Sequence, residues 1–192
     1  MEMIKNYYGS LCTEMYEILH KEAPQDELAF YLSYAEKGMK ILEPLCGSGR
    51  FLAPFIERGY DIKGIDLSAE MLAKLKEKVP NAKVFQKDIL KYDSTEKYDY
   101  IFISSGSVSL FTDMDLCKRI LHKMKDLLKK NGKFVFAVDT IADKCSDTIS
   151  KPSSAGFYDF AMERFKLFEN VEEICSAFSA VDKVEKEYLG NL

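Results

Sequence analysis

The chain has 192 residues, of which 47% are hydrophobic and 30% are charged, and its formal net charge is -4. This composition is typical of one globular domain with a substantial core. The weak negative charge provides no long-range attraction to nucleic acid or to an anionic membrane, so neither partner is indicated. Residues 1–9 are polar, and no apolar run approaches the roughly 20 residues that cross a bilayer. We therefore expect a cytoplasmic protein without a signal peptide or a membrane span.

Metal and disulfide chemistry are not indicated either. The chain contains five cysteines, which are widely spaced without a Cys-x-x-Cys pair, and only two histidines. An odd number of scattered cysteines predicts reduced thiols rather than a zinc site or a disulfide framework. The sequence carries no information on the oligomeric state.

The N-terminal part, residues 4–37, predicts two helices that Pro24 separates. The second helix opens at Gln25. The first has an apolar face with the spacing i, i+4, i+7 and i+8, formed by Leu11, Met15, Ile18 and Leu19.

Strands and helices then alternate from residue 39 to residue 139. We expect strands at residues 39–45, 61–66, 82–86, 98–104 and 133–139, and helices at residues 50–58, 69–78 and 113–129. Gly59 and Ser68 are the expected helix C-cap and N-cap, and Asn131-Gly132 is an expected turn. The alternation indicates βαβ units, and the continuously apolar strands indicate helices on both faces of a sheet. The predicted fold class is α/β, a three-layer αβα sandwich with a Rossmann-like, mostly parallel sheet.

The signals are weaker after Asp139. Residues 144–156 are polar and predict a loop, and Asn170 can cap a helix with Glu173 at the reciprocal capping-box position. Residues 181–189 continue that helix or form a strand. We expect an abbreviated C-terminal region.

The first predicted strand runs into a turn that contains Gly47, Ser48 and Gly49. Glycines let the backbone turn tightly and let a ligand approach it, and an open α/β sheet binds ligands at the carboxyl ends of its strands. A lone Gly-x-Gly is weak evidence, but this one lies between a strand and a helix. The alternative is a tight turn without a ligand.

Acidic and small residues follow the next strands. Asp66 ends the second strand at the distance from the glycine turn where a ribose-binding acid is expected, although it could instead cap the following helix. Asp88 follows the third strand, where its carboxylate could accept from an adenine amine and the Ile89 amide could donate to a ring nitrogen. Ser105 belongs to a run of small residues after the fourth strand, which would leave room for a cofactor.

In this order on successive strands, Glu43-x-x-x-Gly47-x-Gly49, Asp66 and Asp88 resemble the first three motifs of class I S-adenosylmethionine (SAM)-dependent methyltransferases of the small-molecule type. The run from Lys129 to Lys133 is similar to that family's turn before the fifth strand. Residues 7–12 and 14–16 are similar to a lid helix of some members. The resemblance implies one domain, 1–192, with a helical lid at 1–38, a cofactor-binding core at 39–139 and a C-terminal region at 140–192.

The resemblance also implies roles for individual residues. Glu43 would place the methionine amino group, Arg50 is a candidate partner for the methionine carboxylate, and Asp66 would hold the ribose hydroxyls. Tyr8 and Tyr16 could close over the sulfonium by cation–π attraction, or they could only pack the first helix. The remaining cofactor-binding candidates are Gly47, Ser48, Gly49, Leu67, Asp88, Ile89 and Ser105.

The predicted activity is methyl transfer from SAM to a small molecule that the sequence does not identify. Such a displacement needs orientation and desolvation more than a catalytic triad. We assign no catalytic residue, since His122 in mid-helix is more typical of a structural role. The alternatives are a nicotinamide-dependent oxidoreductase, disfavoured because the glycine turn lacks a third small residue, and a non-catalytic SAM-binding or scaffold protein. The short C-terminal region motivates the scaffold alternative.

Overall fold

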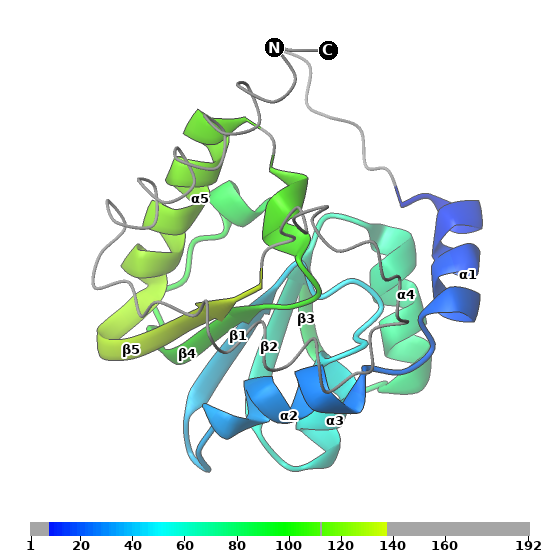
Figure 1. Ribbon diagram of the computed structural model, residues 1–192, viewed down its shortest axis with the longest axis horizontal. Coiled ribbons are helices and arrows are strands. Elements are labelled where there is room, and N and C mark those ends of the chain that lie inside the picture. Colours follow the sequence, from blue (N-terminus) through cyan, green and yellow to red (C-terminus); the bar gives the residue numbers. More distant parts are fainter. Residues whose placement is uncertain (1–7, 112, 138–192) are drawn as a thin grey trace, which may run out of the picture.

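A computed structural model describes residues 8–111 and 113–137, and the structural statements below concern this part of the chain. Parallel strands form one 5-stranded sheet in the order β3-β2-β1-β4-β5 (Figure 1). The strands are β1 (Lys40–Pro44), β2 (Asp61–Asp66), β3 (Lys83–Gln86), β4 (Tyr98–Ile103) and β5 (Leu128–Phe136). The predicted parallel sheet is therefore confirmed.

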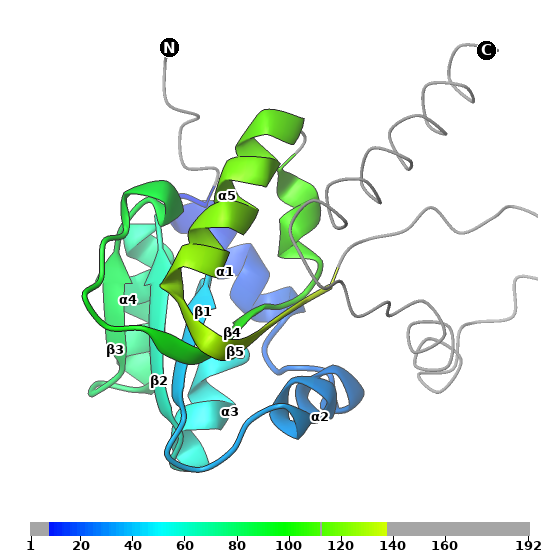
Figure 2. The same cartoon turned by 90° about the vertical axis from the view of Figure 1, so that its left-hand side faces the viewer.

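Helices cover both faces of the sheet (Figure 2). Ile41 of β1 packs in one cluster with Leu28 and Phe55, whereas the adjacent Leu42 packs with Ile120 on the opposite face, because successive side chains of a strand alternate between faces. The three-layer α/β class is thus confirmed. The helices are α1 (Ser10–Leu19), α2 (Gln25–Ser33), α3 (Leu52–Glu57), α4 (Ala69–Lys78) and α5 (Met114–Leu127), with short 3-10 helices η1 (Ile89–Lys91) and η2 (Ser107–Leu110).

The predicted helix ends have the expected capping contacts. The Ser68 hydroxyl accepts a 3.1 Å hydrogen bond from the Met71 amide at the start of α4. Asp113 caps α5 by accepting from the Leu116 amide at 2.8 Å. Gly59, with φ +74°, follows α3 in the left-handed conformation that a glycine adopts without a steric penalty.

The predicted turn at Asn131-Gly132 is wrong, because these residues lie within β5. The pairing of β4 with β5 shifts there: Tyr98 pairs with Leu128, whereas Tyr100 pairs with Lys133. The extra residues make this pairing irregular, and Gly132 permits a close approach, since a Cβ at that position would lie 2.9 Å from the Tyr98 carbonyl oxygen. The sequence signal for a turn thus marks an irregular strand.

Helix α1 forms as predicted, but its apolar face points outward. Leu11, Met15, Ile18 and Leu19 are between 54% and 80% exposed among the described residues. Polar contacts hold the opposite face instead: Glu17 pairs with Lys78 of α4 at 2.6 Å. Periodicity therefore identified the helix but not the direction of its faces. The predicted elements at residues 144–156, 170–180 and 181–189 lie outside the described residues. No described helix has the length and hydrophobicity that a membrane span requires.

Glu96 provides a test of the electrostatics of the sheet. Its carboxylate accepts from the ammonium groups of Lys40 and Lys63 on neighbouring strands, and these contacts lower its pKa to about 2. A carboxylate with a lowered pKa stabilises the folded state above its ordinary pKa, and the effect disappears as the pH falls toward 2. We expect the free energy of unfolding to decrease between pH 5 and pH 2, and Glu96→Gln to reduce that decrease, in urea titrations.

The matched control is Asp61→Asn. Asp61 pairs with Lys83 at 2.7 Å, but the two side chains are 47% and 59% exposed, so this ion pair contributes little. An equal response of Glu96→Gln and Asp61→Asn to pH would contradict the prediction.

Candidate functional site

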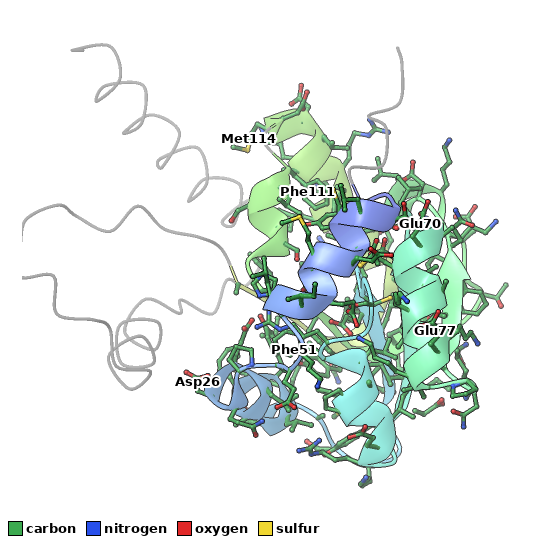
Figure 3. The ribbon with its side chains drawn as sticks, turned by 90° about the vertical axis from the view of Figure 1, so that its right-hand side faces the viewer. Asp26, Phe51, Glu70, Glu77, Phe111 and Met114 are labelled. Atoms are coloured by element: carbon green, nitrogen blue, oxygen red, sulfur yellow. The ribbon has the colours of Figure 1, made fainter. Side chains whose placement is uncertain are left out.

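The candidate site lies at the carboxyl ends of β1, β2 and β4. Strand β1 has β2 on one side and β4 on the other, so the order of the sheet reverses at β1, and open α/β sheets bind ligands at such a point. Helix α1 lies close to this region. Figure 3 shows it between the segment that carries Phe111 and Met114 and helix α4, which carries Glu70 and Glu77.

The two glycines of the turn after β1 have different surroundings. Both have positive φ, +50° at Gly47 and +80° at Gly49. A Cβ on Gly49 would lie 2.2 Å from Leu75 Cδ1, so this glycine lets the turn pack against α4. A Cβ on Gly47 would meet only Met71 Sδ, at 4.0 Å. Gly47 therefore leaves open the space that a bound group could occupy.

Asp66 joins the ends of β1 and β2. Its Oδ2 accepts from the Gly47 amide and its Oδ1 from the Ser68 amide, both at 2.8 Å. Burial raises the pKa of Asp66, and the amides of Ser68 and Gly47 oppose that increase. Each carboxylate oxygen has a second lone pair, so Asp66 can hold the turn and still accept from a vicinal diol. The capping alternative and the ligand alternative are thus compatible.

Glu43 is a buried acid at the point where the order of the sheet reverses. Its side chain is on β1, and the residue is 1% exposed. Oε1 accepts from the Ser104 hydroxyl of the turn after β4 at 2.9 Å, whereas Oε2 has no hydrogen-bond partner among the described residues. Burial raises the pKa of Glu43 well above its ordinary value, and the Ser104 hydroxyl and the Leu52 amide oppose that increase, whereas the nearby carboxylates of Asp66 and Glu27 add to it. An unsatisfied buried carboxylate oxygen fits a cationic hydrogen-bond donor such as an ammonium group.

Helix α1 and the residues just before it bring the two predicted tyrosines together. The rings of Tyr8 and Tyr16 meet edge to face with centroids 6.1 Å apart, and the Tyr8 carbonyl accepts from the Ser68 hydroxyl at 2.8 Å. Burial raises the pKa of Tyr16, and the adjacent Arg50 guanidinium opposes that increase. Arg50 Nε donates to the Glu22 carbonyl at 3.0 Å, so this residue fastens the α1–α2 connection to the glycine turn.

The remaining predicted site residues differ from one another in exposure and in hydrogen-bond partners. Ser48 is 1% exposed, and its hydroxyl has no hydrogen-bond partner among the described residues. Leu67 is 44% exposed after β2. Asp88 caps η1 by accepting from the Leu90 amide at 2.8 Å, while the side chain of Ile89 is 8% exposed and packs with α5 in the core. Only the backbone of Ile89 is therefore a candidate for ligand contact.

Sequence reasoning missed Glu27 and Ser104 as individual site residues. Glu27 of α2 accepts from the Ser105 amide at 2.8 Å, and Ser104 donates to Glu43. Ser104 could have been found from its place in the small-residue run after β4. Glu27 gave no signal, because its role depends on where α2 packs against the sheet. Among the described residues, no group of His, Cys, Asp and Glu could hold a metal ion.

The fold is Rossmann-like, and the comparisons match it to methyltransferases. Residues 41–132 match the family model described as a methyltransferase domain. An uncharacterized methyltransferase of Bacillus cytotoxicus is 32% identical over 124 residues, which cover 63% of this chain and 58% of that protein. Over this stretch the chain resembles class I SAM-dependent methyltransferases, whose solved structures include one complexed with SAM. It spans about half the length of two other relatives that are named as methyltransferases, 54% and 52%.

Solved structures agree with the fold. The sugar N-methyltransferase KedS8 from Streptoalloteichus sp. ATCC 53650 superposes with a TM-score of 0.59 at 20% identity, covering 72% of this chain and 57% of that chain. The glycopeptide N-methyltransferase MtfA, solved with SAM, has a TM-score of 0.52 at 22% identity, with coverages of 59% and 50%. The comparisons match methyltransferases and give no support to the oxidoreductase alternative.

The different surroundings of the glycines predict different effects on stability. Gly49→Ala should reduce the free energy of unfolding by roughly 1–3 kcal/mol more than Gly47→Ala, because only the former overpacks the core at Leu75. Gly38→Ala is the matched control: Gly38 has φ +86° and no atom within 4 Å of an added Cβ, so it measures the backbone cost alone. Equal losses for Gly49→Ala and Gly38→Ala in urea unfolding would contradict the packing role.

The raised pKa of Glu43 predicts a cost in stability for the ligand-free protein. A buried carboxyl whose pKa is raised destabilises the folded state increasingly as the pH rises above its ordinary pKa, since ionisation is easier in the unfolded chain. Glu43→Gln should therefore increase the free energy of unfolding, with a gain that is larger at pH 8 than at pH 5. A variant that is less stable than the wild type at pH 8 would rule this out.

Proposed function

We propose that this protein transfers a methyl group from SAM to a small-molecule acceptor. The proposal depends on one observation above all: the buried Glu43 carboxylate has an open oxygen beside a glycine turn that Asp66 holds in place. The methionine part of SAM would present its ammonium group to Glu43, and the adenosine part would present the ribose diol to the adjacent turn.

The residues support the following assignment for the bound cofactor. Glu43 accepts from the methionine ammonium group, and Asp66 accepts from the ribose hydroxyls with its remaining lone pairs. Leu67, Asp88 and the Ile89 backbone frame the adenine. The turn residues Gly47, Ser48 and Gly49, together with Ser105, line the methionine side.

Helix α1 and Arg50 complete the proposed site. Tyr8 and Tyr16 cover the sulfonium side, where aromatic faces attract a cation. Arg50 reaches the methionine carboxylate while its Nε holds the Glu22 carbonyl. Residues 1–38 serve as the lid, 39–139 as the cofactor-binding core and 140–192 as the C-terminal region, all within one domain.

The chemistry requires little from ionisable side chains. Bound SAM supplies a methyl carbon that its sulfonium has already activated. The acceptor's lone pair forms the new bond to that carbon as the carbon–sulfur bond breaks, and the sulfur takes the electron pair. The protein's residues align the two groups and exclude water, so a base is needed only if the acceptor atom carries a proton to be lost.

The acceptor class follows from the structural neighbours, which act on a sugar and on a glycopeptide according to their names. We infer that this chain also methylates a small polar molecule. We place it in the cytoplasm, because the five cysteines of the sequence are widely spaced without a Cys-x-x-Cys pair, a pattern that predicts reduced thiols.

Calorimetry with SAM, S-adenosylhomocysteine and NADH tests the cofactor assignment. We expect the first two to bind and NADH not to bind, and Asp66→Ala should weaken SAM binding by about one to two orders of magnitude, since charge-assisted hydrogen bonds to the ribose are lost. Asp61→Ala, at the exposed opposite end of β2, is the matched control. An unchanged dissociation constant in folded Asp66→Ala would refute the ribose assignment. Methyl transfer from labelled SAM to any member of an amine and sugar panel would exclude the non-catalytic alternative.

A further inference from the structure

Helix α2 is fastened to the turn after β4 by two side chains that lie one helical turn apart. The Glu27 carboxylate accepts from the Ser105 amide at 2.8 Å, and the Tyr31 hydroxyl donates to the Ile103 carbonyl at 3.3 Å. The spacing i, i+4 puts both side chains on one face of the helix. That face cannot rotate freely, because Tyr31 is 0% exposed and its carbonyl accepts from the Tyr100 hydroxyl at 3.0 Å.

The turn that Glu27 contacts has an unfavourable backbone. Ser105 has φ +54° and Gly106 has φ +64°, and the Ser107 amide closes the turn on the Ser104 carbonyl at 3.1 Å. Positive φ at both central residues is the pattern of a type I′ turn, which favours Asn-Gly. A serine is disfavoured in the first central position, so the conformation needs support from outside the turn.

The residue that opens this turn is also the residue that holds Glu43. Ser104 is 7% exposed, and its hydroxyl donates to Glu43 Oε1 at 2.9 Å. Because Ser104 and Ser105 are adjacent, the backbone conformation at Ser105 determines where the Ser104 hydroxyl points. A continuous path of contacts therefore leads from α2 to the open oxygen of Glu43.

We propose that Glu27 is a positioning residue: by holding Ser105 in the left-handed conformation it orients Ser104, and through Ser104 it aims the Glu43 carboxylate at the ammonium group of the cofactor. This inference rests on the proposed function. It assigns to α2 the control of the methionine half of the cofactor site. The adenosine half, which depends on Asp66 and Asp88, is independent of Glu27.

The test compares two ligands that differ in the methionine part. SAM carries the ammonium group, whereas 5′-methylthioadenosine retains the adenosine and lacks the amino-acid portion. Calorimetry on the full chain should show that Glu27→Ala weakens SAM binding on the order of tenfold and leaves 5′-methylthioadenosine binding within about twofold of the wild type. Glu27→Gln should lose less SAM affinity than Glu27→Ala, because its amide oxygen can still accept from Ser105.

A double-mutant cycle tests whether Glu27 affects SAM binding through the backbone conformation of Ser105. Glycine adopts positive φ without a steric penalty, so the loss caused by Glu27→Ala should be smaller in a Ser105→Gly background than in the wild type. Equal losses in the two backgrounds would overturn the proposal, as would parallel weakening of both ligands, which indicates general loosening of the site.

Ser104→Ala keeps the proposal testable even if Glu27→Ala does not fold. It removes the donor to Glu43 without changing α2, and it should weaken SAM but not 5′-methylthioadenosine. Unchanged SAM affinity in Ser104→Ala would overturn the proposed path. A wild-type protein that binds neither ligand would instead refute the proposed function, so the two failures are distinguishable.

Discussion

The hydrogen bonds of the Asp66 carboxylate to the Gly47 and Ser68 amides are the contacts on which the site depends. They join the carboxyl ends of β1 and β2, and they hold the glycine turn in a backbone conformation that few other residues adopt. Because the carboxylate is largely removed from water, each amide that it accepts from also offsets the cost of its burial. The same group thus joins the glycine turn after β1 to the start of α4.

The site contains three acids, and burying their charged forms is unfavourable in free energy without a nearby cation. Glu27, Glu43 and Asp66 all have raised pKa values, with burial as the largest cause, and Glu43 lies within electrostatic range of the other two. Such an arrangement stores unfavourable free energy in the ligand-free protein. A positively charged group bound beside these acids would offset that cost.

The two N-terminal helices contribute unequally to the hydrophobic core. Helix α2 is part of the core, because Leu28 and Tyr31 pack with the sheet and with α3. Helix α1 rests on the body through polar contacts such as the Glu17–Lys78 ion pair and exposes its apolar face. An element held by few buried apolar contacts opens at a lower free energy than the core, as the proposed lid would require.

The sequence by itself determined the alternation of elements, the glycine turn and the acids at successive strand ends, since apolar period, caps and turn residues act over short distances along the chain. It could not determine that α1 turns its apolar face outward, that residues 129–132 belong to an irregular part of β5 instead of a turn, or that Gly49 serves packing while Gly47 leaves open space. The contact of Glu27 with Ser105 was equally hidden. These features depend on which surfaces meet in three dimensions, and residues far apart in sequence give no local signal of that meeting.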